Sequence, residues 1–332
     1  MVDYSNKRFD LYFESDYDYS NYLEGLKRAL DDIQNYISIP KKITIQAKVI
    51  LNKGSQLGGT APSSQYTVVH DGKSINIPSS LFSRDYTIMD INAEFYHQDN
   101  RWTFNGGSFD FVAIAVHELY HGLGFYSNIE PFFDQYGLYT TTIPKQEMQK
   151  VFLPPTLYDY HIECDGTRLV DILDGFSRIC ISKANLINTT PLAVQVAAYD
   201  LVPKDTRDRL KTMMTTPGSC YFKSDFITME LYTSKEMPAA VLSHSANSEP
   251  DLMHSKYREK VSYGGTEGYE AVLQALGYGN SELNYIETVS DNCQTIVSTN
   301  QLQDAQSRID AGEFNSASQF HFIFSLMLFI LF

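Results

Sequence analysis

Residues 115–125 read AVHELYHGLGF, and the interpretation of the whole chain starts from this stretch. His117 and His121 stand four residues apart, so on a helix both imidazoles project from the same face. The apolar residues 111–116 before them are typical of a buried helix that holds its side chains rigidly. This spacing predicts that one metal ion accepts a ring nitrogen from each histidine.

Glu118 directly follows the first of these histidines. From there its carboxylate reaches a water on the metal without binding the metal itself. The pattern H-E-x-x-H on a helix indicates a site for one catalytic Zn²⁺ ion, with the glutamate as general base. Because the pattern also occurs by chance, the buried helix and the glycines that follow it carry much of the weight.

Gly124 stands three residues after His121, where we expect the helix to end. Glycine adopts the left-handed conformation that ends many helices, and in a helix interior it costs about 1 kcal/mol relative to alanine. Such a turn returns the chain beneath the metal, where a third ligand can arrive. At the other end, Ser108 or Asp110 can cap the helix.

The arrangement H-E-x-x-H-x-x-G resembles the metzincin zinc peptidases. Their short motif has its third histidine at position 127, where this chain has Ser127, a poor zinc ligand. Residues 242–257 read LSHSANSEPDLMHSKY, and His244 followed by Met253 resembles the third ligand and Met-turn of leishmanolysin-type metzincins. That resemblance implies an insertion after Gly124, His244 as third ligand and Met253 as the apolar floor beneath the metal. Secreted bacterial and fungal proteins with an H-E-x-x-H-G-L-G-F motif are similar.

Several alternatives for the site stay open at this point. His254 and His161 compete with His244 as third ligand. A gluzincin-like hydrolase would instead use a downstream glutamate, and a surface or adhesion protein would keep the fold without catalysis. Tyr257 is a candidate for binding substrate or the oxyanion, although a core or interface role is also compatible. The glutamates available to the gluzincin arrangement are Glu230, Glu267 and Glu270.

The hydrophobic pattern predicts an α+β protein, and the resemblance implies a metzincin-like two-lobe zinc peptidase. Its N-terminal lobe is expected to hold a mixed sheet with the active-site helix, and its C-terminal lobe to be irregular and helical. We expect the strand at 87–95 to be an inner strand or the edge that pairs with substrate. The predicted domains are 1–124, 125–290, a polar linker at 291–319 and a hydrophobic tail at 320–332. Predicted helices are 21–37, 111–122, 192–199, 204–214 and 264–277, predicted strands are 43–51, 66–70 and 87–95, and 54–64 is a predicted loop.

The composition limits the classes of binding partner and the cellular compartments that are compatible with this chain. A net charge of −14 without a Lys/Arg cluster argues against nucleic acid and anionic membranes and leaves protein or peptide substrates. A hydrophobic fraction of 43% is that of a globular protein. The four cysteines predict two disulfides in one of three pairings. They are Cys164, Cys180, Cys220 and Cys293.

The two ends of the chain suggest different cellular locations. The apolar residues 320–332 follow a polar spacer with small residues at 310–312 and 315–317, a pattern typical of a glycosylphosphatidylinositol anchor signal. A buried terminal helix is the alternative. The first residues lack the basic and apolar regions of a signal peptide. Together with the glycosylation sequon at Asn188, the tail nevertheless favours an extracellular or cell-surface protein, attached to the membrane through a C-terminal lipid anchor.

Overall fold

The structure is a computed structural model. It describes residues 2–15, 20–51, 57–82, 89–97, 102–104, 110–132, 135–138, 148–236, 240–246, 252–254, 267–279 and 293–314. Within these residues, no helix is both long and apolar enough to cross a membrane. The predicted hydrophobic tail at 320–332 and Tyr257 lie outside them.

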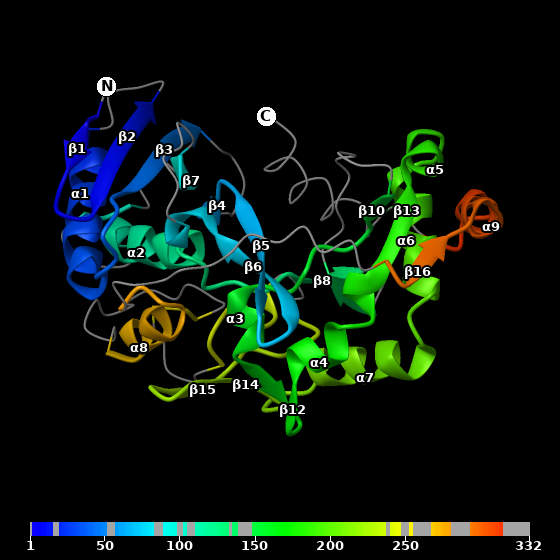
Figure 1. The fold of residues 1–332 in the computed structure, drawn as a ribbon. Helices are drawn as coiled ribbons and strands as arrows, with labels where there is room; N and C mark the ends of the chain where they lie inside the picture. Colours follow the sequence, from blue (N-terminus) through cyan, green and yellow to red (C-terminus); the bar gives the residue numbers. More distant parts are fainter. Residues whose placement is uncertain are drawn as a thin grey trace.

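A mixed five-stranded sheet forms the N-terminal part of the molecule (Figure 1), in the order β1-β2-β3-β7-β4. The three inner strands run parallel to one another, and each edge strand is antiparallel to its neighbour. The strands are β1 (Tyr4–Ser5), β2 (Phe9–Ser15), β3 (Ile43–Leu51), β7 (Ile91–His97) and β4 (Gly58–Pro62).

The core of this part lies between the sheet and two helices. In β3 every second residue, from Ile43 to Val49, is fully buried, which confirms the strand predicted from its alternation. Helices α1 (Ser20–Ile33) and α2 (Phe111–Gly122) contact each other against this apolar face. The predicted helix at 21–37 is shorter than expected, because a 3₁₀ turn, η1 (Gln34–Tyr36), replaces its last turn.

The structure decides between the two alternatives predicted for the strand at 87–95. This strand is β7, an inner strand with β3 on one side and β4 on the other. The edge is β4, which lies within the stretch predicted as a loop because it is rich in Gly, Ser and Pro. Pairing with β7 overrides these weak local preferences, since strand propensity depends strongly on context.

A hairpin leads from the sheet towards the rest of the chain. Strands β5 (Gln65–His70) and β6 (Lys73–Pro78) pair with each other around Asp71 and Gly72, both with positive φ. A 3₁₀ turn, η2 (Ser79–Leu81), follows. The hairpin contacts the segment at 125–241, here called the insert: the backbone amide of Asn76 donates to the carbonyl of Pro155.

The insert after α2 contributes strands to three further sheets, whose strands are drawn from green to orange in Figure 1. The first has the strand order β12-β11-β14-β15, the second has the order β10-β13-β16, in which β16 is Thr295–Val297, and the third is the pair β8-β9. The helices predicted at 192–199 and 204–214 are confirmed as α6 and α7. The elements are β8 (Ile129–Phe132), β9 (Gln135–Leu138), β10 (Met148–Lys150), α3 (Leu157–Tyr160), β11 (Ile162–Cys164), β12 (Thr167–Arg168), α4 (Leu169–Leu173), η3 (Phe176–Arg178), β13 (Ile179–Ser182), α5 (Lys183–Ile187), α6 (Pro191–Asp200), α7 (Lys204–Thr215), β14 (Cys220–Lys223) and β15 (Thr228–Glu230).

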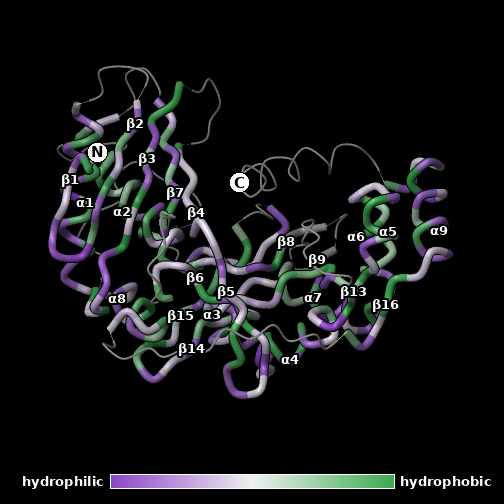
Figure 2. Tube along the Cα trace, turned by 45° about the horizontal axis from the view of Figure 1, so that its top comes forward, coloured by the Kyte–Doolittle hydropathy of each residue, from purple (hydrophilic) through white to green (hydrophobic). Residues whose placement is uncertain are grey.

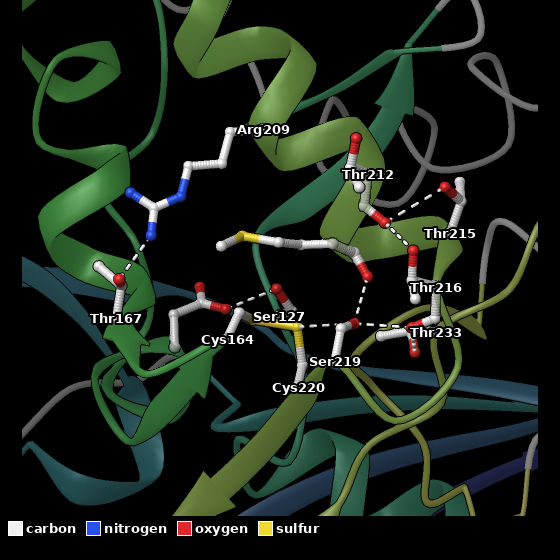
Figure 3. The surroundings of a disulfide bond; sticks show 12 residues. Ser127, Cys164, Thr167, Arg209, Thr212, Thr215, Thr216, Ser219, Cys220 and Thr233 are labelled. Atoms are coloured by element: carbon white, nitrogen blue, oxygen red, sulfur yellow. Dashed lines mark hydrogen bonds between the residues drawn. A yellow bond between two sulfur atoms is a disulfide. The ribbon is translucent and has the colours of Figure 1, made fainter.

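Two disulfides hold the insert together and settle the pairing that the sequence left open. Cys164 bonds Cys220 directly across strands β11 and β14. Figure 3 shows this bond beside Ser219, whose hydroxyl contacts the Cys220 sulfur and the backbone carbonyl of Thr216. The other bond joins Cys180 of the insert to Cys293 in the C-terminal part of the chain.

The C-terminal residues correct the predicted linker at 291–319. Strand β16 (Thr295–Val297) pairs with β13, and helix α9 (Thr299–Asp310) packs on α6. In Figure 2 hydrophilic and hydrophobic colours both occur along α9, which lies near α5 and α6. Its polar composition concealed a narrow apolar stripe, because only Leu302 and Ala305 are buried. Helix α8 (Glu267–Ala275) precedes this segment and is the described part of the helix predicted at 264–277.

Candidate metal centre

Helix α2 supplies two of the predicted ligands. Asp110 caps it by accepting a hydrogen bond from the amide of Val112, as one of the two predicted caps, while Ser108 lies outside the described residues. Most of the helix is buried, including all residues from Phe111 to Val116. His117 and His121 leave its last two turns on the same face, and their Nε2 atoms lie 3.2 Å apart.

The end of α2 fixes the second histidine. Gly124 has a φ of 103°, as predicted from its position. The amide of Gly124 donates to the carbonyl of His121 and that of Phe125 to the carbonyl of Tyr120, the two hydrogen bonds of a Schellman motif. This turn brings the carbonyl oxygen of Phe125 to 2.7 Å from Nδ1 of His121.

The structure brings His244 to the same place from the far side of the insert. Its ring centroid lies 5.2 Å from that of His117 and 4.9 Å from that of His121. One ligand atom of each of the three rings lies within 4.8 Å of the others. Among the described residues, no carboxylate oxygen or cysteine sulfur joins this group.

A strand-like extension of the insert's sheet carries His244. The chain after β15 pairs with the segment at 240–246: the amide of Tyr232 donates to the carbonyl of His244, and the amide of Leu242 to the carbonyl of Tyr232. Ser245 in turn donates its amide to the carbonyl of Met253. The disulfide-bonded sheet therefore continues directly into the third-ligand segment and the turn after it.

Backbone carbonyls orient all three rings. Nδ1 of His117 lies 2.5 Å from the carbonyl oxygen of Leu252, and Nδ1 of His244 lies 3.1 Å from that of Ala240. Phe125 serves His121 in the same way. Because a carbonyl only accepts, each Nδ1 carries the proton and each Nε2 presents its lone pair. No sequence pattern marks these acceptors, because every residue has a carbonyl.

Burial lowers the pKa of two of the three rings and keeps them uncharged. Burial, reinforced by the neighbouring ring of His117, lowers the pKa of His121 to about 3. Burial also holds the pKa of His244 well below the ordinary histidine value, with the other two rings adding to the effect. Neutral imidazoles are the form that binds a metal ion.

This donor set fits Zn²⁺. Two nitrogens at about 2.05 Å from one tetrahedral ion lie about 3.3 Å apart. The separation of 3.2 Å between Nε2 of His117 and Nε2 of His121 agrees with that value. Three neutral imidazoles with an open fourth position are a typical catalytic zinc set, and hydrogen bonds from Nδ1 to oxygen acceptors usually accompany it.

Glu118 follows His117 in the chain, and its side chain lies against the edge strand. A Cβ added to Gly58 of β4 would approach Cγ of Glu118 to 3.3 Å, so the strand passes directly over this side chain. Burial raises the pKa of the Glu118 carboxyl to about 8 in the metal-free protein. A cation held by the adjacent histidines would favour the ionised form and lower that pKa.

Gly122 allows the helix to approach the strands closely. A Cβ at this position would lie 2.6 Å from a methyl carbon of Ile91 and 2.7 Å from one of Thr60. Any larger residue would push α2 away from β4 and β7. Gly122 therefore allows α2 to lie close to β4 and β7, and this determines the distance between the histidines of α2 and the edge strand.

Met253 and Ser127 have definite places beside the cluster. Met253 is fully buried, and its predecessor Leu252 supplies the carbonyl that orients His117. Ser127, where the short motif has its third histidine, is a buried joint: its amide donates to the hydroxyl of Ser243 and its own hydroxyl to Asp159. Position 127 therefore connects the segments on both sides of the centre.

The other candidate ligands lie outside the group. The ring of His161 packs on Phe222, and His254 forms an isolated bridge with Ser245 and stays outside the three-ring cluster. The carboxylate of Glu230 lies next to Gly218. Neither Glu230 nor Glu270 belongs to the group; the side chain of Glu267 is outside the described part, as is Tyr257.

No protein-family model, curated protein or solved structure matches this chain. The resemblance to metzincins therefore rests on residues 115–125 and 242–253, and the chemistry of the site is argued from its own geometry.

Proposed function

We propose that this protein is a zinc-dependent endopeptidase of the metzincin type, with His117, His121 and His244 as ligands and Glu118 as general base. One observation carries the proposal. Three imidazoles, each oriented through Nδ1 by a backbone carbonyl, converge at the helix that carries Glu118, whose side chain lies against the edge strand β4.

Each residue has a separate task in peptide hydrolysis. When bound, the zinc ion acts as a Lewis acid that polarises the substrate carbonyl and lowers the pKa of water towards 7. The Glu118 carboxylate accepts the proton of the attacking water and delivers it to the leaving amine. The partly buried surroundings of Glu118 strengthen its electrostatic interactions in the transition state.

Strand β4 is the proposed place for the substrate backbone. On the side that faces β7, the carbonyl of Leu57 accepts a hydrogen bond from the backbone amide of Tyr96, and the amide of Ser63 donates to the backbone carbonyl of Asp90. Residues of an antiparallel strand alternate in the side to which their amides and carbonyls point, so Thr60 directs its amide and carbonyl away from β7. An extended peptide adding to this edge would pass beside Glu118. Peptides and unfolded protein segments are thus the substrate class.

The two disulfides are compatible with a secreted or cell-surface enzyme. Asn188 of the sequon is exposed at the end of α5. We keep attachment through a C-terminal lipid anchor as part of the proposal, on the sequence pattern at 310–332.

The test is hydrolysis of casein by the zinc-loaded full chain and by Glu118→Gln at equal zinc content. We expect Glu118→Gln to lose about a hundredfold or more in rate, because general acid–base catalysis contributes about 10² to 10⁴. Glu163→Gln, which removes a surface ion pair with Lys223, is the matched control and should keep the parent rate.

The outcomes separate the alternatives. Equal rates for Glu118→Gln and the parent would contradict the assignment of the base. Zinc binding without cleavage of casein or a mixed peptide library would favour an inactive surface or adhesion protein that keeps the fold. A parent that binds no zinc would refute the metal centre itself.

A further inference from the structure

The short helix α3 contacts both segments that meet at the metal centre. One is the chain leaving α2 at 125–128, and the other is the segment at 240–246 that carries His244. We propose that Tyr158 and Asp159 of α3 are positioning residues, which hold the third-ligand segment against the end of α2. This inference rests on the proposed zinc centre, although not on peptide hydrolysis.

Tyr158 holds one point of the third-ligand segment. Its side chain is fully buried, and its ring lies 4.8 Å from that of Phe125 and 5.0 Å from that of Phe222. Its hydroxyl donates to the carbonyl oxygen of Leu242 over 3.0 Å. The ring contacts fix the direction of the hydroxyl, so this bond locates Leu242 relative to the exit of α2.

Leu242 needs such a support. It has a φ of 61°, in the left-handed region that is unfavourable for a residue with a Cβ. A strained residue of this kind persists only where its surroundings impose it, and it often lies at a functional site. Here the amide of Leu242 bonds the carbonyl of Tyr232, and its carbonyl accepts from Tyr158.

The conformation of Leu242 determines where His244 points. Nδ1 of His244 bonds the carbonyl of Ala240, so the hydrogen bond spans the turn at Leu242. If Leu242 relaxed to a negative φ, the carbonyl and the ring would separate. The orientation of Nε2 of His244 therefore depends on a hydroxyl group that lies far earlier in the chain.

Asp159 ties the same helix to the exit of α2. Its buried carboxylate accepts hydrogen bonds from the Ser127 hydroxyl and from the amides of Asn128 and Thr156. Burial raises the pKa of Asp159, and these three donors oppose that effect. Because the amide of Ser127 also donates to the hydroxyl of Ser243, hydrogen bonds connect α3 to the residue next to His244 by a second route.

The test compares two buried tyrosines. Tyr158→Phe removes only the hydroxyl bonded to Leu242, whereas Tyr278→Phe removes one that is equally buried but bonded to Ser80. For both variants of the full chain, the zinc dissociation constant is measured by competition with a chromophoric chelator. The thermal midpoint of the zinc-free protein is measured alongside.

We expect the thermal midpoint to be lower in both variants. Only Tyr158→Phe should also bind zinc about tenfold more weakly, because loss of a group that orients a metal ligand costs at least about tenfold in affinity. Ser127→Ala should weaken zinc binding in the same way, with Ser177→Ala as its buried control. Zinc affinity equal to the parent in both Tyr158→Phe and Ser127→Ala would overturn the inference.

Failure of this inference is distinct from failure of the proposed activity. A parent that binds zinc but cleaves no peptide refutes the peptidase and leaves the zinc comparison fully readable. A parent that binds no zinc overturns both the metal centre and the positioning role.

Discussion

The two regions that form the metal centre reach the same point by different means. Helix α2 places His117 and His121 through local geometry, because four residues make about one helical turn. The segment at 240–246 places His244 through pairing with the chain after β15, a strained Leu242 and the hydrogen bonds of α3. Two of the three histidines are therefore positioned by a single helix, whereas the position of the third depends on contacts between distant segments of the chain.

The largest expected effect is the removal of a ligand from either region. His121→Ala and His244→Ala should each weaken zinc binding by more than about a hundredfold, since loss of an outer hydrogen-bond partner alone costs about 10 to 100-fold. The measurement is competition with a chelator. If His244→Ala kept the parent affinity, the third ligand would have to lie elsewhere, with His254→Ala as the next variant to measure.

A glycine pair tests whether the exit of α2 is as robust as its helical turns. Gly124→Ala should destabilise the protein by about 1–2 kcal/mol and weaken zinc binding, because positive φ disfavours a Cβ and the turn supplies the Phe125 carbonyl. Gly166→Ala has the same backbone penalty, with no atom near the new Cβ and no link to the centre. It should lower stability without changing zinc affinity. Equal zinc affinity in both variants would show that the Phe125 carbonyl is dispensable.

A substitution at position 127 tests whether the third ligand could come from the chain just after α2 instead of from the segment at 240–246. Ser127→His restores the histidine of the short motif, yet we expect weaker zinc binding and a lower thermal midpoint. The site is 2% exposed, and the serine hydroxyl and amide bond Asp159 and Ser243. Tighter zinc binding by Ser127→His than by the parent would contradict this placement.

The smallest effect concerns pH in the metal-free protein. His121 has a pKa of about 3 in the folded chain, against an ordinary value near 6.5. Between these values the unfolded chain binds a proton that the folded chain does not, so stability falls as the pH drops below about 6.5. The thermal midpoint should therefore decrease from about pH 7 to about pH 5, and His121→Asn should show a weaker decrease. Identical slopes would contradict the buried, neutral state of this ring.

The same division explains what the sequence could predict. Helix α2, its cap at Asp110 and its end at Gly124 follow from local rules of spacing and conformation, and the structure has all three. The strand at 43–51 follows from alternation. These features depend on residues close together in the chain.

The remainder depends on contacts between distant segments. The edge strand β4 has a composition typical of loops and exists through its pairing with β7. The role of Tyr158 has no local pattern, since only the fold brings its hydroxyl to Leu242. His244 was named from a resemblance, and its approach to α2 required the whole insert. Helix α9 was missed because two buried residues in a polar stretch give a weak periodic signal.

X-ray absorption at the zinc edge, recorded for the parent and for His244→Ala at one zinc per chain, counts the ligands of the metal directly. We predict three imidazole ligands at about 2.0 Å in the parent and two in the variant. An imidazole count unchanged by His244→Ala would contradict a centre built from both regions.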